Sequence, residues 1–237
     1  MTHESKTTLQ KAGITVLVGT FLSPFLQVLL LLAAADTIQI FRAWLYLVLS
    51  FVGMFGGIVI VAMSNPELVN ERGCWRKRKD TMRGDRLLIM LYGILGFYVT
   101  PIVAGLDVGR YHWSSLGVWA AVIGTLLFGL GSILITWAMR VNPYFEVNVR
   151  IQRDRNHRVI SAGLYSIIRH PGYLGAILWA LSTPLIVGSL YGLIPAAIAS
   201  AAFVIRLVLE ERILRTELPG YAEYTRQVHY RLLPGIW

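Results

Sequence analysis

Two clusters of polar side chains in the second half of the chain carry residue types that could bind a charged ligand. The first lies in the string Arg169-His170-Pro171-Gly172-Tyr173-Leu174-Gly175. Proline is favoured in the first turn of a helix, where its missing N–H needs no partner, so we expect Arg169 and His170 at a helix N-terminus. The free N–H groups and the positive dipole end of such a terminus favour anions. Tyr173 adds an aromatic face or a hydroxyl, and Gly175 leaves room for a flat ligand to approach the backbone.

The second cluster contains Arg206, Glu210 and Glu211, with Arg212 and Arg215 just beyond it. An arginine inside a membrane helix costs about 2.5–3.5 kcal/mol on insertion scales, so Arg206 needs a partner or an aqueous cavity. Glu210 lies four residues further on and shares its helix face, so we expect these two side chains to pair. Glu211 points about 100° away from Glu210. Two adjacent carboxylates at a membrane border could bind hydroxyls or a cationic group.

Six apolar segments must position these clusters. The chain is 55% hydrophobic and 15% charged, whereas soluble domains carry roughly 25% charged residues. The first four segments are each long enough to cross the hydrocarbon core and must be helical there. The fifth is short and contains Pro184, so it is kinked or forms half of a helical hairpin with the sixth. The segments are 13–34, 43–64, 87–105, 115–139, 173–187 and 191–209. We therefore predict an all-α, polytopic transmembrane helix bundle of about six membrane helices, with a C-terminal helical hairpin and an interfacial tail.

The distribution of Lys and Arg predicts the orientation of the bundle. The chain has 22 such residues. Arg42 and Arg110 fall in the loops placed outside and Arg206 in the sixth segment, while the rest lie in the N-terminal arm, the loops after the second and fourth segments, and the tail. The positive-inside rule then predicts a multi-pass protein with both termini and the active site facing the cytoplasm. The same rule and contact with anionic lipids account for the net charge of +9 better than nucleic acid does.

The chain divides in function near its middle. Residues 1–110 supply N-terminal membrane helices and a basic loop at 71–86, which we interpret as a topology anchor for lipid headgroups rather than a substrate site. Residues 111–237 hold both polar clusters and form the expected core with a cytosolic site. The single Cys74 excludes an intramolecular disulfide and a multi-cysteine metal centre, and we expect no metal. The Ala33-Ala34-Ala35 run is compatible with signal cleavage, but the first segment is longer than a usual signal core and more spans follow it.

These motifs resemble the isoprenylcysteine carboxyl methyltransferase family and its phospholipid methyltransferase relatives. Residues 1–110 resemble the family only as generic membrane helices. The matching pieces are Asn142-Pro143, Ser161-Ala162-Gly163-Leu164-Tyr165, the string 169–175, Glu210-Glu211-Arg212, and the tail from Pro219-Gly220-Tyr221 to Trp237.

The resemblance implies a methyltransferase with S-adenosylmethionine in a cytosolic pocket, roofed by the tail and open toward the bilayer for a lipid-like or prenylated acceptor. It implies that Arg169 orients an acceptor carboxylate, the favoured acceptor group, and that Glu210, together with Glu211, binds polar groups of the cofactor. A carboxylate needs no general base at pH 7, whereas an amine would need one, such as His170 or Glu211. The implied catalytic residues are Arg169 and Glu211, and the implied cofactor-binding residues are Tyr165, His170, Pro171, Tyr173, Gly175 and Glu210.

Two other functions are compatible with the same residues. Membrane sterol reductases carry a similar Arg-His-Pro-x-Tyr string and use NADPH, although they are usually longer and commonly have Asn where this chain has Gly172. A non-catalytic scaffold or small transporter is the third possibility. Transporters tend to place charges near the bilayer midplane, whereas here only Arg206 lies deeper than the cytosolic border. The sequence does not define an oligomeric state.

Overall fold

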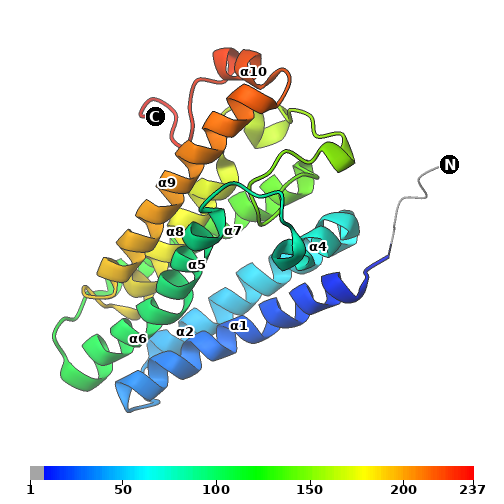
Figure 1. The fold of residues 1–237 in the computed structure, drawn as a ribbon. Helices are drawn as coiled ribbons and strands as arrows, with labels where there is room; N and C mark the ends of the chain where they lie inside the picture. Colours follow the sequence, from blue (N-terminus) through cyan, green and yellow to red (C-terminus); the bar gives the residue numbers. More distant parts are fainter. Residues whose placement is uncertain (1–7) are drawn as a thin grey trace.

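The computed structural model describes residues 8–237, which form an all-helical bundle (Figure 1). Residues 1–7 of the N-terminal arm, expected in the cytoplasm, lie outside this described part. Within residues 8–237, five helices are long and apolar enough to cross a membrane, at Lys11–Ala35, Phe41–Ser64, Asp85–Tyr111, Val118–Val141 and Leu193–Glu217. The apolar helix Pro171–Val187 is shorter, as predicted. The expected fold class of about six membrane helices is confirmed.

The helices are numbered along the chain in Figure 1. The second span joins α2 (Phe41–Ser50) to α3 (Gly57–Ser64) through a π-helical turn, and the third joins α5 (Asp85–Ile94) to α6 (Thr100–Gly105) and ends at Tyr111. The other long helices are α1 (Lys11–Ala35), α7 (Val118–Val141), α8 (Pro171–Val187) and α9 (Leu193–Glu217). Two short helices, α4 (Pro66–Gly73) and α10 (Tyr221–Gln227), complete the fold. The last long helix extends about two turns beyond the predicted segment 191–209, so it carries both glutamates of the second cluster.

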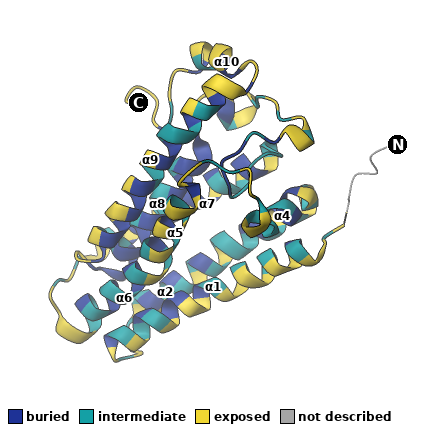
Figure 2. Ribbon diagram, viewed as in Figure 1, coloured by how far each residue is buried: buried dark blue, intermediate teal, exposed yellow. Residues whose placement is uncertain are grey.

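The outer faces of the long helices are exposed (Figure 2). Many of the exposed side chains there are large and apolar, as expected for surfaces that contact lipid. Leu29, Val52 and Leu126 are each more than 60% exposed although they lie in the middle of candidate spans. In water such a surface would be costly, because apolar area is unfavourable by roughly 25 cal/mol per Å². This distribution of exposed side chains matches a multi-pass integral membrane protein.

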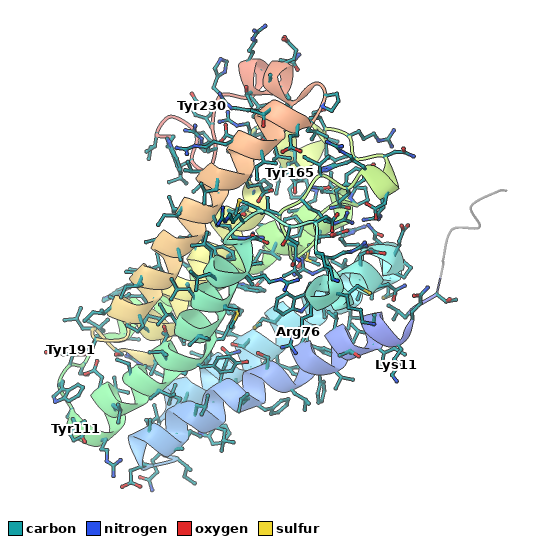
Figure 3. The ribbon with its side chains drawn as sticks, viewed as in Figure 1. Lys11, Arg76, Tyr111, Tyr165, Tyr191 and Tyr230 are labelled. Carbon is teal, nitrogen blue, oxygen red and sulfur yellow. The ribbon has the colours of Figure 1, made fainter. Side chains whose placement is uncertain are left out.

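The connections between helices gather at two opposite ends of the bundle (Figure 1). At one end lie the turns after α1, after Tyr111 and after α8, and Asp107 holds two of them by accepting hydrogen bonds from the hydroxyls of Ser114 (2.6 Å) and Ser189 (2.5 Å). At the other end lie α4, the connection 142–170, α10 and the tail. Figure 3 labels Tyr111 and Tyr191 at the first end and Tyr165 and Tyr230 at the second.

The hairpin of α8 and α9 begins as the sequence predicts. Pro171 occupies the first turn of α8. Gly188 ends it with a φ of 96°, a left-handed conformation that glycine adopts without a side-chain penalty. The hairpin therefore returns the chain to the end of the bundle where both polar clusters lie.

Candidate functional site

A cavity of about 340 Å³ opens among α5, α7, α8 and α9 at the end that holds α10. Its volume lies within the range of small-molecule sites. The lining changes in character along the cavity. Polar and aromatic side chains line one part, including Tyr165, Arg169, His170, Glu210 and Tyr221, whereas the part between the membrane helices is lined by apolar side chains such as Ile135, Ala176 and Phe203. A ligand with one polar and one apolar half matches this lining.

A buried chain of hydrogen bonds crosses the boundary between the two parts. The hydroxyl of Tyr173 donates to Glu210 Oε2 at 2.5 Å and accepts from Arg206 Nη1 at 2.6 Å. Arg206 also donates from Nε to Asp85 Oδ1 at 2.8 Å and from Nη2 to the carbonyl of Val147 at 2.6 Å. The partner of Arg206 is therefore Asp85 rather than Glu210, and the pairing expected from helix spacing was wrong. The reason is that a fully buried carboxylate from another helix reaches the guanidinium directly, while Glu210 bonds to Tyr173.

Glu211 lies at the centre of a second buried group, on the tail side of α9. Its carboxylate accepts hydrogen bonds from Arg169 at 2.8 Å, Arg215 at 3.0 Å and Arg231 at 2.6 Å. Its own side chain and that of Arg169 are each 3% exposed. Charge-assisted bonds of this kind are about twice as strong as neutral ones. One carboxylate thus joins the start of α8, the end of α9 and the tail.

The tail crosses the N-terminus of α8 as an extended strap. The N–H of Arg169 donates to the carbonyl of Tyr230 at 2.9 Å, and the N–H of His170 donates to the carbonyl of Arg231 at 3.0 Å. The Arg169 guanidinium adds bonds to the carbonyls of Val228 (2.6 Å) and His229 (2.8 Å). The backbone N–H groups that we expected to be free for an anion are therefore partly used by the tail, although Arg169 Nε has no hydrogen-bond partner among the described residues.

Aromatic side chains from α10 cover the polar part of the cavity. Tyr221 and Tyr224 pack with Leu214 and Leu218 into one apolar cluster, and all four line the cavity. The Tyr224 hydroxyl donates to the carbonyl of Tyr165 at 2.5 Å. Burial raises the pKa of the Tyr221 and Tyr224 hydroxyls above their usual value, so both stay protonated as donors. The roof is therefore uncharged and aromatic, which suits a flat ring.

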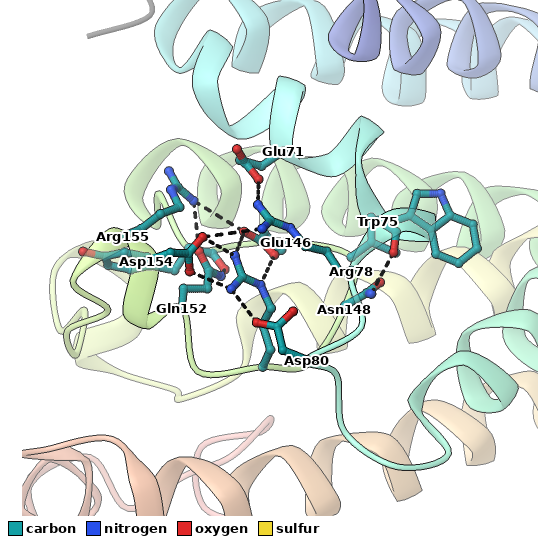
Figure 4. A network of polar contacts seen from close by, with 12 residues as sticks. Glu71, Trp75, Arg78, Asp80, Glu146, Asn148, Gln152, Asp154 and Arg155 are labelled. Carbon is teal, nitrogen blue, oxygen red and sulfur yellow. Dashed lines mark hydrogen bonds and ion pairs between the residues drawn. The ribbon is translucent and has the colours of Figure 1, made fainter. Parts of the chain in front are cut away.

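The loop after α7 forms the remaining wall, and a charged network fixes it to the loop after α4 (Figure 4). The Arg150 side chain is 1% exposed and donates to Glu146 (2.9 Å) and Asp154 (2.7 Å) of its own loop and to Asp80 (3.0 Å) of the other. Burial lowers the pKa of Arg150, but the hydrogen bonds and charges of Glu146 and Asp154 outweigh it and leave the pKa raised. Arg78 adds contacts to Glu71 and Asp154.

His157 belongs to the same loop after α7. It lines the cavity, its ring lies 4.5 Å from that of Tyr144, and its Nδ1 accepts a long hydrogen bond from the backbone of Gln152 at 3.4 Å. Burial, with Arg150 and Arg155 nearby, lowers the pKa of His157 to about 4. The imidazole is therefore neutral at pH 7. Within residues 8–237, no group of three or more His, Cys, Asp or Glu side chains is placed to hold a metal.

Most of the site residues expected from the sequence come together in this cavity. They are Tyr165, Arg169, His170, Tyr173 and Glu210. Pro171, Gly175 and Glu211 lie outside its lining. Gly175 faces α7, because a Cβ placed there would lie 2.6 Å from Ile135 Cγ1 and 2.8 Å from the carbonyl of Gly131. The room at Gly175 is thus taken by a neighbouring helix rather than left for a ligand.

Several site residues were missed because they come from the first half of the chain or from a loop without a recognised motif. Tyr92 and Phe97 of the third span and Arg150 of the loop after α7 line the cavity. Asp85, also in the third span, lies behind the lining and contacts Arg206. A signal for Asp85 existed. It is an acidic residue at the border of an apolar segment, directly before Arg86, and Arg206 needed a buried partner.

The similarity to known proteins covers the part of the chain that contains most of these site residues. The model of the isoprenylcysteine carboxyl methyltransferase family matches residues 122–216. The chain is 30% identical to protein-S-isoprenylcysteine O-methyltransferase B of Arabidopsis thaliana over 146 residues, which is 60% of this chain and 70% of that protein. It is 31% identical to the Saccharomyces cerevisiae protein-S-isoprenylcysteine O-methyltransferase over 130 residues, 52% of each chain. It is 28% identical to the Xenopus laevis protein of the same name over 113 residues, 46% of this chain and 39% of that protein. The match thus spans less than two thirds of the yeast and Xenopus relatives.

Proposed function

We propose that this chain, which belongs to the isoprenylcysteine carboxyl methyltransferase family, methylates the carboxylate of a prenylated or otherwise lipid-modified acceptor inside the cavity described above. Enzymes of this family use S-adenosylmethionine as methyl donor. The observation that carries the proposal is the two-part lining of one cavity, with polar and aromatic side chains toward α10 and apolar side chains between the membrane helices. A soluble donor and a lipid-like acceptor need these two surroundings, and they must meet at one point.

The polar part fits the donor in three respects. Tyr221 and Tyr224 offer uncharged aromatic surface for an adenine ring, and Glu210 offers a carboxylate for a cationic or hydroxyl group. Arg169 Nε is a buried donor without a partner among the described residues, which a bound ligand would satisfy. We assign Tyr165, His170 and Tyr173 to the same part, with Pro171 and Gly175 fixing the start of α8 rather than touching the donor.

Arg206 is our candidate for orienting the acceptor carboxylate. Its guanidinium lies over the rings of Tyr173 (5.5 Å) and Phe203 (5.6 Å), at the border between the polar and apolar parts. Three of its five N–H groups are used by Asp85, Tyr173 and Val147, so two stay available. Arg169 remains a second candidate through its Nε. Glu211, bound by three arginines, supports the site by holding the tail and is a poor candidate for a base.

The reaction needs no proton transfer by the protein. S-adenosylmethionine, when bound, supplies a methyl group already activated by its sulfonium. An acceptor carboxylate is ionised at pH 7, so the side chains act by alignment. Arg206 holds the carboxylate, Tyr173 fixes Arg206 relative to Glu210, and the aromatic roof excludes water. Good alignment of two reactants contributes roughly 7–11 kcal/mol to lowering the barrier.

The cavity faces the cytoplasm in this proposal, because Lys and Arg concentrate at the end of the bundle that contains it. The exposed side chains of Arg76, Lys77 and Lys79 then contact anionic lipid headgroups. In this proposal residues 111–237 supply most of the donor site. Residues 1–110 supply the charged side chains that hold the loop after α7 in place and part of the apolar lining of the cavity.

The test combines ligand binding with methyl transfer on purified protein. Calorimetry should detect heat of binding for S-adenosylhomocysteine but not for NADPH. Transfer of a radiolabelled methyl group to a prenylated cysteine analogue should be measurable. His170→Ala and Glu210→Ala should each weaken S-adenosylhomocysteine binding at least about tenfold, while the exposed control Lys77→Ala binds as the wild type does. A folded protein that gives no heat with S-adenosylhomocysteine, or that binds NADPH instead, contradicts the proposal.

A further inference from the structure

Arg72, near the C-terminal end of α4, is a residue of the basic loop that lines the cavity. Its Nη1 donates to the carbonyl of Phe145 at 2.9 Å, and its guanidinium lies 5.7 Å from the centre of the Phe145 ring. The helix that carries it is held against α1, because Asn70 Oδ1 accepts a hydrogen bond from the N–H of Gln10 at 2.8 Å. Arg72 therefore reaches the cavity from a fixed support in the first half of the chain.

Arg72 and Arg206 bind the same short segment of the loop after α7. Arg206 Nη2 donates to the carbonyl of Val147 at 2.6 Å, and Arg72 binds the carbonyl two residues earlier. The α-carbons of Phe145 and Val147 are at most about 7.6 Å apart, because consecutive α-carbons are about 3.8 Å apart. Burial, and then the charge of Arg206, lowers the pKa of Arg72 to about 10. Both guanidinium groups are therefore protonated neighbours at pH 7.

The charge of Arg72 lacks a carboxylate partner in the part of the chain that the structure describes. The other buried arginines have one, since Arg206 pairs with Asp85 and Arg169 pairs with Glu211. The cavity lining contains five arginines and only two glutamates, so its charge is positive. A guanidinium has five N–H groups, and Arg72 uses one of them. A buried cation without a partner is costly, and a bound anion would remove this cost.

We propose that Arg72 and Arg206 together form a two-arginine clamp for the carboxylate of the acceptor. This inference rests on the proposed function, which assigns that carboxylate to Arg206, and it adds a binding residue from outside the part of the chain that the family model matches. A carboxylate has two acceptor oxygens, so it can accept hydrogen bonds from both guanidinium groups. A neutral group in its place leaves the charge of Arg72 without an anion. The clamp therefore selects an anionic acceptor over a neutral one.

The experiment measures the binding of two acceptor analogues, N-acetyl-S-farnesylcysteine and its carboxamide, to purified protein with S-adenosylhomocysteine bound. The wild type should bind the carboxylate at least about tenfold more tightly than the carboxamide, because hydrogen bonds between charged groups are the stronger ones. Arg72→Gln should weaken binding of the carboxylate at least about tenfold and leave binding of the carboxamide within about twofold of the wild type. Arg72→Lys keeps the charge and should regain part of the loss. Arg83→Gln is the matched control, since Arg83 is an exposed arginine of the same basic loop.

Binding of S-adenosylhomocysteine without an acceptor keeps the outcomes distinct. It should be the same in the wild type and in Arg72→Gln, which shows that the variant is folded and that the donor part of the cavity is intact. Equal weakening of both acceptor analogues overturns the inference, because Arg72 then acts only by packing on Phe145. Weaker binding of S-adenosylhomocysteine with an unchanged preference for the carboxylate also overturns it, because Arg72 then binds the donor. A wild type that binds S-adenosylhomocysteine but neither analogue contradicts the proposed function itself.

Discussion

The substitution Asp85→Asn tests the buried ion pair that joins the two halves of the chain. Asp85 is fully buried and the Arg206 side chain is 8% exposed, with 2.8 Å between Oδ1 and Nε. At an effective dielectric constant of about 20, two unit charges about 4 Å apart interact by about 4 kcal/mol. Removing one partner of a buried pair costs about 3–5 kcal/mol, since the other charge stays buried. Arg206 keeps its bonds to Tyr173 and Val147, so we expect the lower end of this range, about 3 kcal/mol.

The assay is reversible unfolding in mixed micelles with increasing dodecyl sulfate, which gives a free energy of unfolding for each variant. Glu223→Gln is the matched control, because its partner is Arg226 at 3.1 Å and the two side chains are 60% and 78% exposed. Exposed pairs contribute about 0–1 kcal/mol. The double variant Asp85→Asn/Arg206→Met should recover about 2 kcal/mol or more, since no charge is then left unpaired. Equal losses for Asp85→Asn and Glu223→Gln, or strict additivity in the double variant, would refute the reasoning.

Three further predictions concern the tail, the helix packing and pH. Glu211→Gln should increase amide hydrogen exchange across residues 228–237, because the carboxylate that holds three arginines is lost; unchanged exchange there would argue against a tail lock. Gly175→Ala should destabilise the protein by about 1–3 kcal/mol by overpacking α7, whereas Gly129→Ala, where a Cβ meets nothing within 4 Å, should not. The pKa of His157 is lowered to about 4 from about 6.5 in the unfolded chain. The unfolded chain therefore binds a proton that the native state does not between these values, and stability should fall by up to about 1.4 kcal/mol per pH unit as the pH drops from 6.5 to 4. His157→Gln should flatten this part of the unfolding profile.

The fold was predictable because each apolar segment must form a helix in the bilayer whichever segments pack against it. Hydrophobic length and the need to satisfy backbone hydrogen bonds within the bilayer act on one segment at a time. The same holds for the start of α8, where Pro171 and its neighbours indicate a helix N-terminus regardless of what packs against it. The concentration of site residues at 165–173 and at Glu210 followed from the motif, and the cavity lies beside them.

What the sequence did not reveal are contacts that depend on which helices become neighbours. Spacing along one helix pairs Arg206 with Glu210, but a buried carboxylate from α5 offers Arg206 a closer partner. Gly175 is compatible with an open face or a close helix contact, and only the packing of α7 distinguishes these. Glu211 looked like half of a ligand site, but its three arginine partners come from the start of α8, from α9 itself and from the tail. Their convergence on one carboxylate depends on tertiary packing.

The first half of the chain is best understood as part of the site rather than as a separate anchor. Asp85 accepts a hydrogen bond from the N–H of Val149 at 3.0 Å as well as from Arg206, so one carboxylate fixes both a wall of the cavity and its central cation. Asp80 reaches Arg150 in the same wall. The basic loop therefore has two kinds of residue. Some make buried contacts that shape the cavity, and others are exposed cations that can contact lipid headgroups. Neutralising the exposed Lys77 should leave the cavity unchanged, whereas changing Asp80 or Asp85 should alter its shape, because these two carboxylates contact residues that line it.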